Sequence, residues 1–139
     1  MDVPGDDNKF NNITVSNSDV VPAINISGDD NAFSPIKLDN VNGTGIRVGP
    51  DAVGTNITGV DARGGNGTVI DVRGVNNTVS DVVVDDYAGG PLVDVPGDDN
   101  KFNNITVSNS DVVPDVSWFR DPTATKALCF MMAVTTARR

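Results

Sequence analysis

The chain has 139 residues and a formal net charge of −9, with ten Lys and Arg residues against nineteen acidic residues that are all Asp. This length fits one domain with a single core. Phosphate binding needs clustered Lys and Arg, so the scattered basic residues exclude nucleic acid from the expected partners. The 22 Val, 16 Asn and 14 Gly residues, with no Glu, Gln or His, indicate an all-β chain of short strands and turns.

The first segment, Asp2–Pro22, returns without a change at Asp94–Pro114, 92 residues later. An identical segment of this length indicates a repeat architecture or a duplication. Met1 leads directly into the segment with no basic region or apolar stretch, so we expect no signal peptide in this chain. The longest apolar run, residues 127–134, is far shorter than the roughly 20 residues that cross a bilayer, so no membrane span is expected.

Two series of short strands alternate along residues 1–120. The first begins with Asn or Pro and continues with alternating apolar residues, at 12–15, 35–38, 56–58, 77–79 and 104–107. The second occupies residues 23–26, 45–48, 69–72 and 92–95. In the second series, steps of 23, 22, 24 and 23 residues separate Val3, Ile26, Val48, Val72 and Val95. Such recurrence makes each unit one coil of a parallel solenoid, because no helical crossover fits between the strands.

Alternation within each strand predicts which side chains face inward. The predicted core residues are Ile13, Val15, Ile24, Ile26, Ile36, Leu38, Ile46, Val48, Ile57, Val60, Val69 or Ile70, Val72, Val79, Val82, Val93, Val95, Ile105 and Val107. Two places after the inward Val or Leu, the strands carry Asn17, Asn40, Gly59, Asp81 and Asn109. Because Asn tolerates left-handed φ and its amide can bond an Asn in the next coil, we expect an inward or turn-lining asparagine ladder, broken at Gly59 and Asp81.

Two segments depart from the repeat. Residues 85–91 carry the only Tyr and are predicted to protrude as a loop. Residues 121–139 form a separate C-terminal part, in which Asp121 and Pro122 suit the start of a helix over 122–137. We expect this helix to cap the last coil, since an open solenoid end exposes an apolar cross-section.

The pattern NNITVSNSDVVPAINIS, with its variants KLDNVNGTGIRV and NNTVSDVVV, resembles the repeat of the right-handed parallel β-helix proteins of the pectin-lyase-like class. The resemblance covers about residues 2–118 and implies a right-handed parallel β-helix of about five coils of 22–24 residues. It also implies activity on polysaccharides. The chain lacks the Gly-His-Gly and Arg-x-Lys motifs of the polygalacturonase branch, and lyase chemistry would need calcium beside Arg47, Arg63 or Arg73.

Acidic turns with the sequence Gly-Asp-Asp-Asn recur three times. Adjacent carboxylates on stacked coils suit Ca²⁺, or the acid and base of a glycosidase. The candidate calcium ligands are Asp6, Asp7, Asp29, Asp30, Asp98 and Asp99. Asp29 and Asp30 are also the candidate catalytic residues. The alternative interpretation is a solvated turn with no ligand, which is the commoner use of such sequences.

The sequence favours a structural or interaction module over an enzyme. We expect a segment of a repetitive extracellular or cell-surface fibre or adhesin whose coils stack end to end, with no cofactor unless the acidic turns bind calcium. The alternative is a protein that binds or degrades polysaccharide, as the resemblance implies; as an enzyme it would be a polysaccharide lyase or glycoside hydrolase. Deliberate duplication remains a third explanation of the identical segments.

Overall fold

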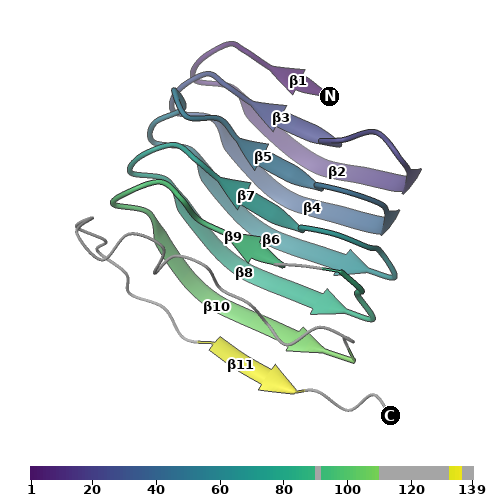
Figure 1. Cartoon of the computed structure of the whole chain (residues 1–139). Helices are drawn as coiled ribbons and strands as arrows, with labels where there is room; N and C mark the ends of the chain where they lie inside the picture. Colours follow the sequence, from purple (N-terminus) through teal and green to yellow (C-terminus); the bar gives the residue numbers. More distant parts are fainter. Residues whose placement is uncertain (90–91, 110–131, 136–139) are drawn as a thin grey trace.

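The computed structural model describes residues 1–89, 92–109 and 132–135. The chain winds in successive coils, and the strands of neighbouring coils pair side by side to form two parallel β-sheets (Figure 1). The first sheet contains β1 (Asp2–Val3), β3 (Ile24–Ile26), β5 (Ile46–Val48), β7 (Ile70–Val72) and β9 (Val93–Asp94). The second sheet contains β2 (Lys9–Ser18), β4 (Ala32–Val41), β6 (Asn56–Arg63), β8 (Thr78–Asp85), β10 (Lys101–Ser108) and β11 (Met132–Thr135). No helix occurs in the described residues.

Each coil consists of one short strand followed by one long strand, so coil 1 is β1 and β2 and coil 5 is β9 and β10. The register pairs Val3 with Ile26, Ile26 with Val48, and Val48 with Val72. The expected coil length of 22–24 residues, the all-β class and the parallel solenoid of about five coils are therefore confirmed.

The core fills the space between the two sheets. Every predicted core residue is buried except Ile13 and Val15, which are half-buried, and both Val69 and Ile70 are inside. The structure adds buried side chains that the strand pattern did not indicate: Val3, Ala23, Phe33, Val41, Ala52, Ala62, Val84, Tyr87, Leu92 and Phe102. Most lie at strand ends and in turns, where period-2 alternation carries no information.

Three corners turn the chain around the core, and residues with positive φ, between +48° and +76°, gather at them. One column of such residues precedes the long strand and comprises Asp7, Asp30, Gly54, Asn76 and Asp99. A second lies within the long strand and comprises Asn12, Pro35, Gly59, Asp81 and Asn104, of which only Pro35 has negative φ. A third ends the strand and comprises Asn17, Asn40, Gly64, Asp86 and Asn109. Asn, Asp and Gly dominate because other residues are strained in the left-handed region.

The predicted asparagine ladder therefore combines residues from two of these columns. Asn17 and Asn40 do stack, with the Nδ2 atom of Asn40 donating to Oδ1 of Asn17 at 2.8 Å. Asn109 lies in the same column, but Asp81 and Gly59 belong to the column inside the strand. The cause is a register shift of three residues, because Ile36 pairs with Val60 and not with Ile57 as the Asn-Ile-Thr similarity suggested.

A buried asparagine ladder lies one residue after the first corner, and the sequence interpretation missed it. Its members are Asn8, Asn31, Thr55, Asn77 and Asn100. The Oδ1 atom of Asn100 accepts from the backbone N–H of Asn77 at 2.8 Å, and its Nδ2 donates to the carbonyl of Gly74 at 2.9 Å. The side chains of Asn31, Asn77 and Asn100 thus satisfy backbone groups of the preceding coil, which are costly to leave unpaired when buried.

Thr55 interrupts this ladder, and its hydroxyl oxygen is buried without a hydrogen-bond partner. In a Thr55→Asn variant, Oδ1 should accept a hydrogen bond from the N–H of Asn31, and Nδ2 should donate one to the carbonyl of Gly28. The Asn residues of the other coils make the equivalent bonds. Two added hydrogen bonds predict a gain of about 1–2 kcal/mol in the free energy of unfolding, measured by urea titration. Thr55→Val is the matched control and should change stability by less than about 1 kcal/mol. Equal stability of the Asn and Val variants would contradict the ladder.

The loop expected at residues 85–91 needs correction, whereas the expected C-terminal helix is mostly untested. Tyr87 does not protrude: its side chain is fully buried over Gly65, its hydroxyl donates to the carbonyl of Val41 at 3.2 Å, and burial raises its pKa to about 12. The expected helix over 122–137 lies mostly outside the described residues. Its four described residues form strand β11, which pairs in parallel with β10.

Candidate functional site

The acidic turns use their first Asp to join successive coils. Asp6 accepts a hydrogen bond from the backbone N–H of Asp29 at 2.8 Å, and Asp29 accepts one from the N–H of Val53 at 2.9 Å. The second Asp of each turn, such as Asp7 and Asp30, occupies the left-handed corner and is exposed. In the turns of coils 1 and 2, the carboxylate pair is therefore divided between a backbone contact and solvent.

The three acidic turns do not form one cluster. Asp6 and Asp7 lie in coil 1 beside Asp29 and Asp30 in coil 2, whereas residues 98–99 lie in coil 5. With coils about 4.8 Å apart, this last pair is on the order of 14 Å from the second turn. Within the described ranges, no group of three or more Asp or Cys side chains is arranged to hold a metal ion. Calcium binding at these turns stays a prediction.

The three Arg residues of the coils all pair with Asp residues outside the acidic turns. Arg73 and Arg47 lie 3.0 and 3.4 Å from the same Oδ2 atom of Asp71, which is buried. Arg63 pairs with Asp61 at 2.8 Å and with Asp85 at 3.3 Å. The described residues therefore provide no unpaired Arg in the coils for lyase chemistry at the turns.

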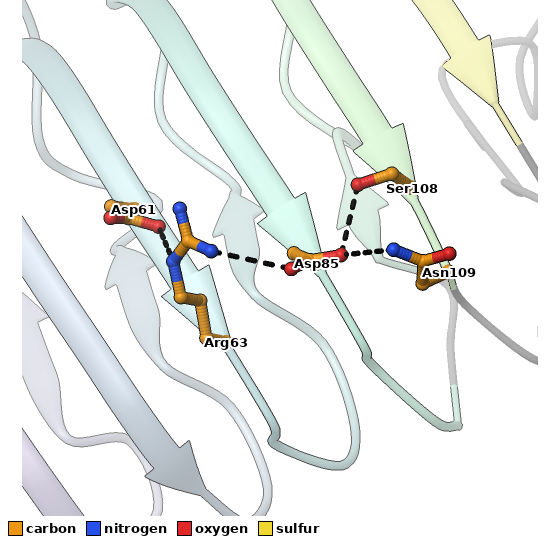
Figure 2. Close-up of polar contacts among 5 residues, drawn as sticks. All are labelled: Asp61, Arg63, Asp85, Ser108 and Asn109. Atoms are coloured by element: carbon orange, nitrogen blue, oxygen red, sulfur yellow. Dashed lines mark hydrogen bonds and ion pairs between the residues drawn. The ribbon is translucent and has the colours of Figure 1, made fainter.

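Asp85 is the centre of a polar network that joins coils 3, 4 and 5 (Figure 2). Its Oδ1 accepts hydrogen bonds from Nδ2 of Asn109 at 2.9 Å and from Oγ of Ser108 at 3.0 Å. Its Oδ2 accepts a hydrogen bond from Arg63, which also binds Asp61. The Asn109 and Ser108 hydrogen bonds, helped by Arg63, hold the pKa of Asp85 below its ordinary value, although partial burial opposes the shift.

This network predicts a pH dependence of stability. A lowered pKa in the folded state means that Asp85 stabilises the fold above the unfolded value of 3.8 and loses this effect as pH falls through the folded pKa. Asp85→Asn should therefore lower stability near neutral pH by up to about 1 kcal/mol, the scale of an exposed ion pair. The difference from the parent should shrink below pH 3.8. Urea titrations across this range test it, with exposed Asp51→Asn as the control; a pH-independent difference would contradict the assignment.

Two shallow depressions lie on the second sheet over coils 1 to 3. The first, of about 220 Å³, is lined by Lys9, Phe10, Asn11, Ala32, Phe33, Ser34, Asn56 and Thr58. The second, of about 310 Å³, is lined by Asn12, Ile13, Thr14, Pro35, Ile36, Lys37, Gly59 and Asp61. Their amide, hydroxyl and charged groups can hydrogen-bond a polar ligand.

The first coil exposes an apolar face that the identical fifth coil does not. Phe10, Ile13 and Val15 are half-buried, whereas their counterparts Phe102, Ile105 and Val107 are 0%, 1% and 2% exposed. The sequences are the same, so the difference arises from neighbours: β2 pairs only with β4 among the described strands, whereas β10 lies between β8 and β11. We call Phe10, Ile13 and Val15, with the outer edges of β1 and β2, the N-terminal face.

Comparison of the chain with protein-family models, with curated proteins and with solved structures gives no match. In the described ranges, no helix has the length and apolar character required to span a membrane. The geometry of the coils and of the N-terminal face is therefore the basis on which a function is proposed.

Proposed function

We propose that the chain is a structural or interaction module, a length of elongated β-solenoid that stacks end to end in an extracellular or cell-surface assembly. The observation that carries the proposal is the register of the duplicated segment. Its second copy begins 92 residues after the first and occupies the same position in the coil, four coils further along.

Register matters because a shift of one residue turns every inward side chain to solvent. In the second copy, Ile105 pairs with Val82 and Val107 pairs with Val84, and all four are buried. The segment is therefore compatible with a coil on either side: coil 2 follows the first copy, and coil 4 precedes the second. Coils with this property can be added along one axis without changing the cross-section.

Stacking through the N-terminal face predicts association that rises with protein concentration. Ile13→Asp should abolish it, because a carboxylate would be buried at the contact without a partner. Thr14→Asp is the matched control, since Thr14 is the exposed neighbour on the same strand. Light scattering and electron microscopy measure particle mass and length. A monomer at every concentration, or equal assembly of the Ile13→Asp variant, would contradict end-to-end stacking.

The second candidate function is binding or degradation of polysaccharide, in line with the resemblance to the pectin-lyase-like class. The depression of about 310 Å³ on the second sheet supports it, because Asn12, Lys37 and Asp61 present groups that hydrogen-bond sugar hydroxyls. Pectate, alginate and neutral glycans, each with and without Ca²⁺, form the test panel. Turnover that is lost in Asp29→Ala or Asp30→Ala would favour this function over the structural one.

A further inference from the structure

The duplicated segment is present in two environments, and the second environment indicates what the first lacks. In coil 5 the segment is docked on coil 4 along both sheets, where β10 pairs with β8 and β9 pairs with β7. In coil 1 the same residues form the N-terminal face, and no described strand lies beyond β1 and β2. Coil 4 therefore serves as an observed partner for the sequence of the N-terminal face.

Three Asn side chains of coil 5 bond to coil 4. Nδ2 of Asn100 donates to the carbonyl of Gly74 at 2.9 Å, and Nδ2 of Asn104 donates to Oδ1 of Asp81 at 2.7 Å. Nδ2 of Asn109 donates to Oδ1 of Asp85 at 2.9 Å. The corresponding amide groups in coil 1 make no such bond among the described residues; they belong to Asn8, Asn12 and Asn17.

The backbone shows the same difference. The N–H groups of Gly97 and Lys101 donate to the carbonyls of Val72 and Asn77 in coil 4, at 3.2 and 2.8 Å. Their counterparts in coil 1 are Gly5 and Lys9, which lie on the outer edge of the described solenoid. An unpaired strand edge of this kind is a template for parallel strand addition.

We propose that the N-terminal face binds a parallel coil of the coil 4 type, supplied by a further unit of the 92-residue repeat joined before Asp2, because coil 4 of this unit is already covered by coil 5. This inference rests on the proposed function, since it names the partner that growth at this end requires. Recognition combines apolar contact with Phe10, Ile13 and Val15 and two carboxylates at the corners. Amide-to-carboxylate hydrogen bonds are stronger than neutral ones, so the positions of Asp81 and Asp85 favour this coil type.

The test adds residues 71–93 directly before Asp2 in the full chain, which reproduces the natural Val93–Asp94 junction. Hydrogen exchange measured by NMR then reports on the amides of Gly5 and Lys9, with Gly97 and Lys101 as internal references. Both test amides should exchange at least about 100-fold more slowly than in the parent, because they become hydrogen-bonded within the solenoid. Exchange at the parental rate would overturn the inference.

Two matched fusions separate docking from added length. Asp in place of Val79, Val82 and Val84 of the added coil should remove the protection of Gly5 and Lys9. Asn in place of Asp81 and Asp85 of the added coil should reduce it, and unchanged protection would overturn the role of the carboxylates. Loss of protection at Gly97 and Lys101 in the fusion with three Asp substitutions would mean that the whole chain is destabilised. In that case, a fusion of residues 2–93 before Asp2 is tested instead, through the exchange of the Gly5 and Lys9 amides.

The hydrogen-exchange test of this inference can fail or succeed independently of the light-scattering test of end-to-end assembly. Protection of Gly5 and Lys9 in the fusion, together with a parent that stays monomeric in light scattering, would support the inference and contradict spontaneous end-to-end assembly. Absence of protection would overturn the inference even if the parent assembled, because assembly would then use another surface.

Discussion

Asn77→Ala should lower the free energy of unfolding by roughly 2–5 kcal/mol, since it leaves two buried backbone groups without partners. The Oδ1 atom of Asn77 accepts from the N–H of Thr55 at 2.8 Å, and its Nδ2 donates to the carbonyl of Ala52 at 3.2 Å. Asn77 itself is only 1% exposed, so water cannot replace either bond. Urea titration measures the loss. An unchanged m-value would show that the variant and the parent expose the same surface area on unfolding.

Asn8→Ala is the matched control for this prediction. Asn8 occupies the same column in coil 1, and among the described residues its backbone N–H and carbonyl form hydrogen bonds but its side chain forms none. Its removal should cost less than about 1 kcal/mol. Similar losses of stability in the two variants would mean that the Asn residues affect the solubility or the unfolded state of the chain, and do not stabilise the fold through buried hydrogen bonds.

Gly74→Ala should destabilise the solenoid by about 3 kcal/mol or more, the upper range for overpacking. A Cβ atom at Gly74 would overlap the carbonyl oxygen of Ala52 and lie 2.7 Å from that of Gly49. Both obstacles are backbone atoms, so no side-chain rotation relieves them. Equivalent overlaps occur at Gly28 with Gly5 and at Gly97 with Gly74, which shows that successive coils approach closely at this turn.

Gly64→Ala isolates the conformational part of such a change. Gly64 has φ of +62°, but no atom lies within 4 Å of the position of an added Cβ. The variant should therefore lose only about 1 kcal/mol, the cost of left-handed backbone for Ala. Thermal and urea unfolding of both variants give the comparison. A loss at Gly64 that equals the loss at Gly74 would contradict the close approach of the coils.

The coil period could be predicted from sequence because two signals agree. Inward Val and Ile residues alternate within strands, and Val3, Ile26 and Val48 recur at nearly constant spacing. The register of the long strands could not be predicted as well. Asn56-Ile57-Thr58 looks like Asn12-Ile13-Thr14, yet Ile57 occupies the position of Phe10 because the turns before the two strands differ in length.

The buried asparagine ladder was missed because its members stand beside Asp residues that suggest a ligand. Asn8, Asn31 and Asn100 each end a Gly-Asp-Asp-Asn turn, and the second Asp of each turn is exposed to solvent. The available signal was Asn77, which shares the Asn position in a turn that has no Asp, Gly-Val-Asn-Asn. The burial of Tyr87 could not be predicted either. The space that its ring fills over Gly65 exists only when the two coils are stacked.

The candidate site was predictable in part. The acidic turns are on the surface at a corner, as a ligand site requires, but the carboxylates of Asp6 and Asp29 accept hydrogen bonds from the backbone of the next coil. The N-terminal face follows from the duplication itself, because only a comparison of identical residues in two environments reveals which contacts coil 1 lacks. That comparison needs the structure.

The central claim is that the 92-residue period extends the solenoid along one axis. A chain with residues 2–93 repeated before Asp2 should form a longer rod with an unchanged cross-section, measured by small-angle X-ray scattering. Four added coils at about 4.8 Å each predict an increase of about 19 Å in the longest dimension. A thicker cross-section, or two bodies joined by a flexible segment, would contradict the claim.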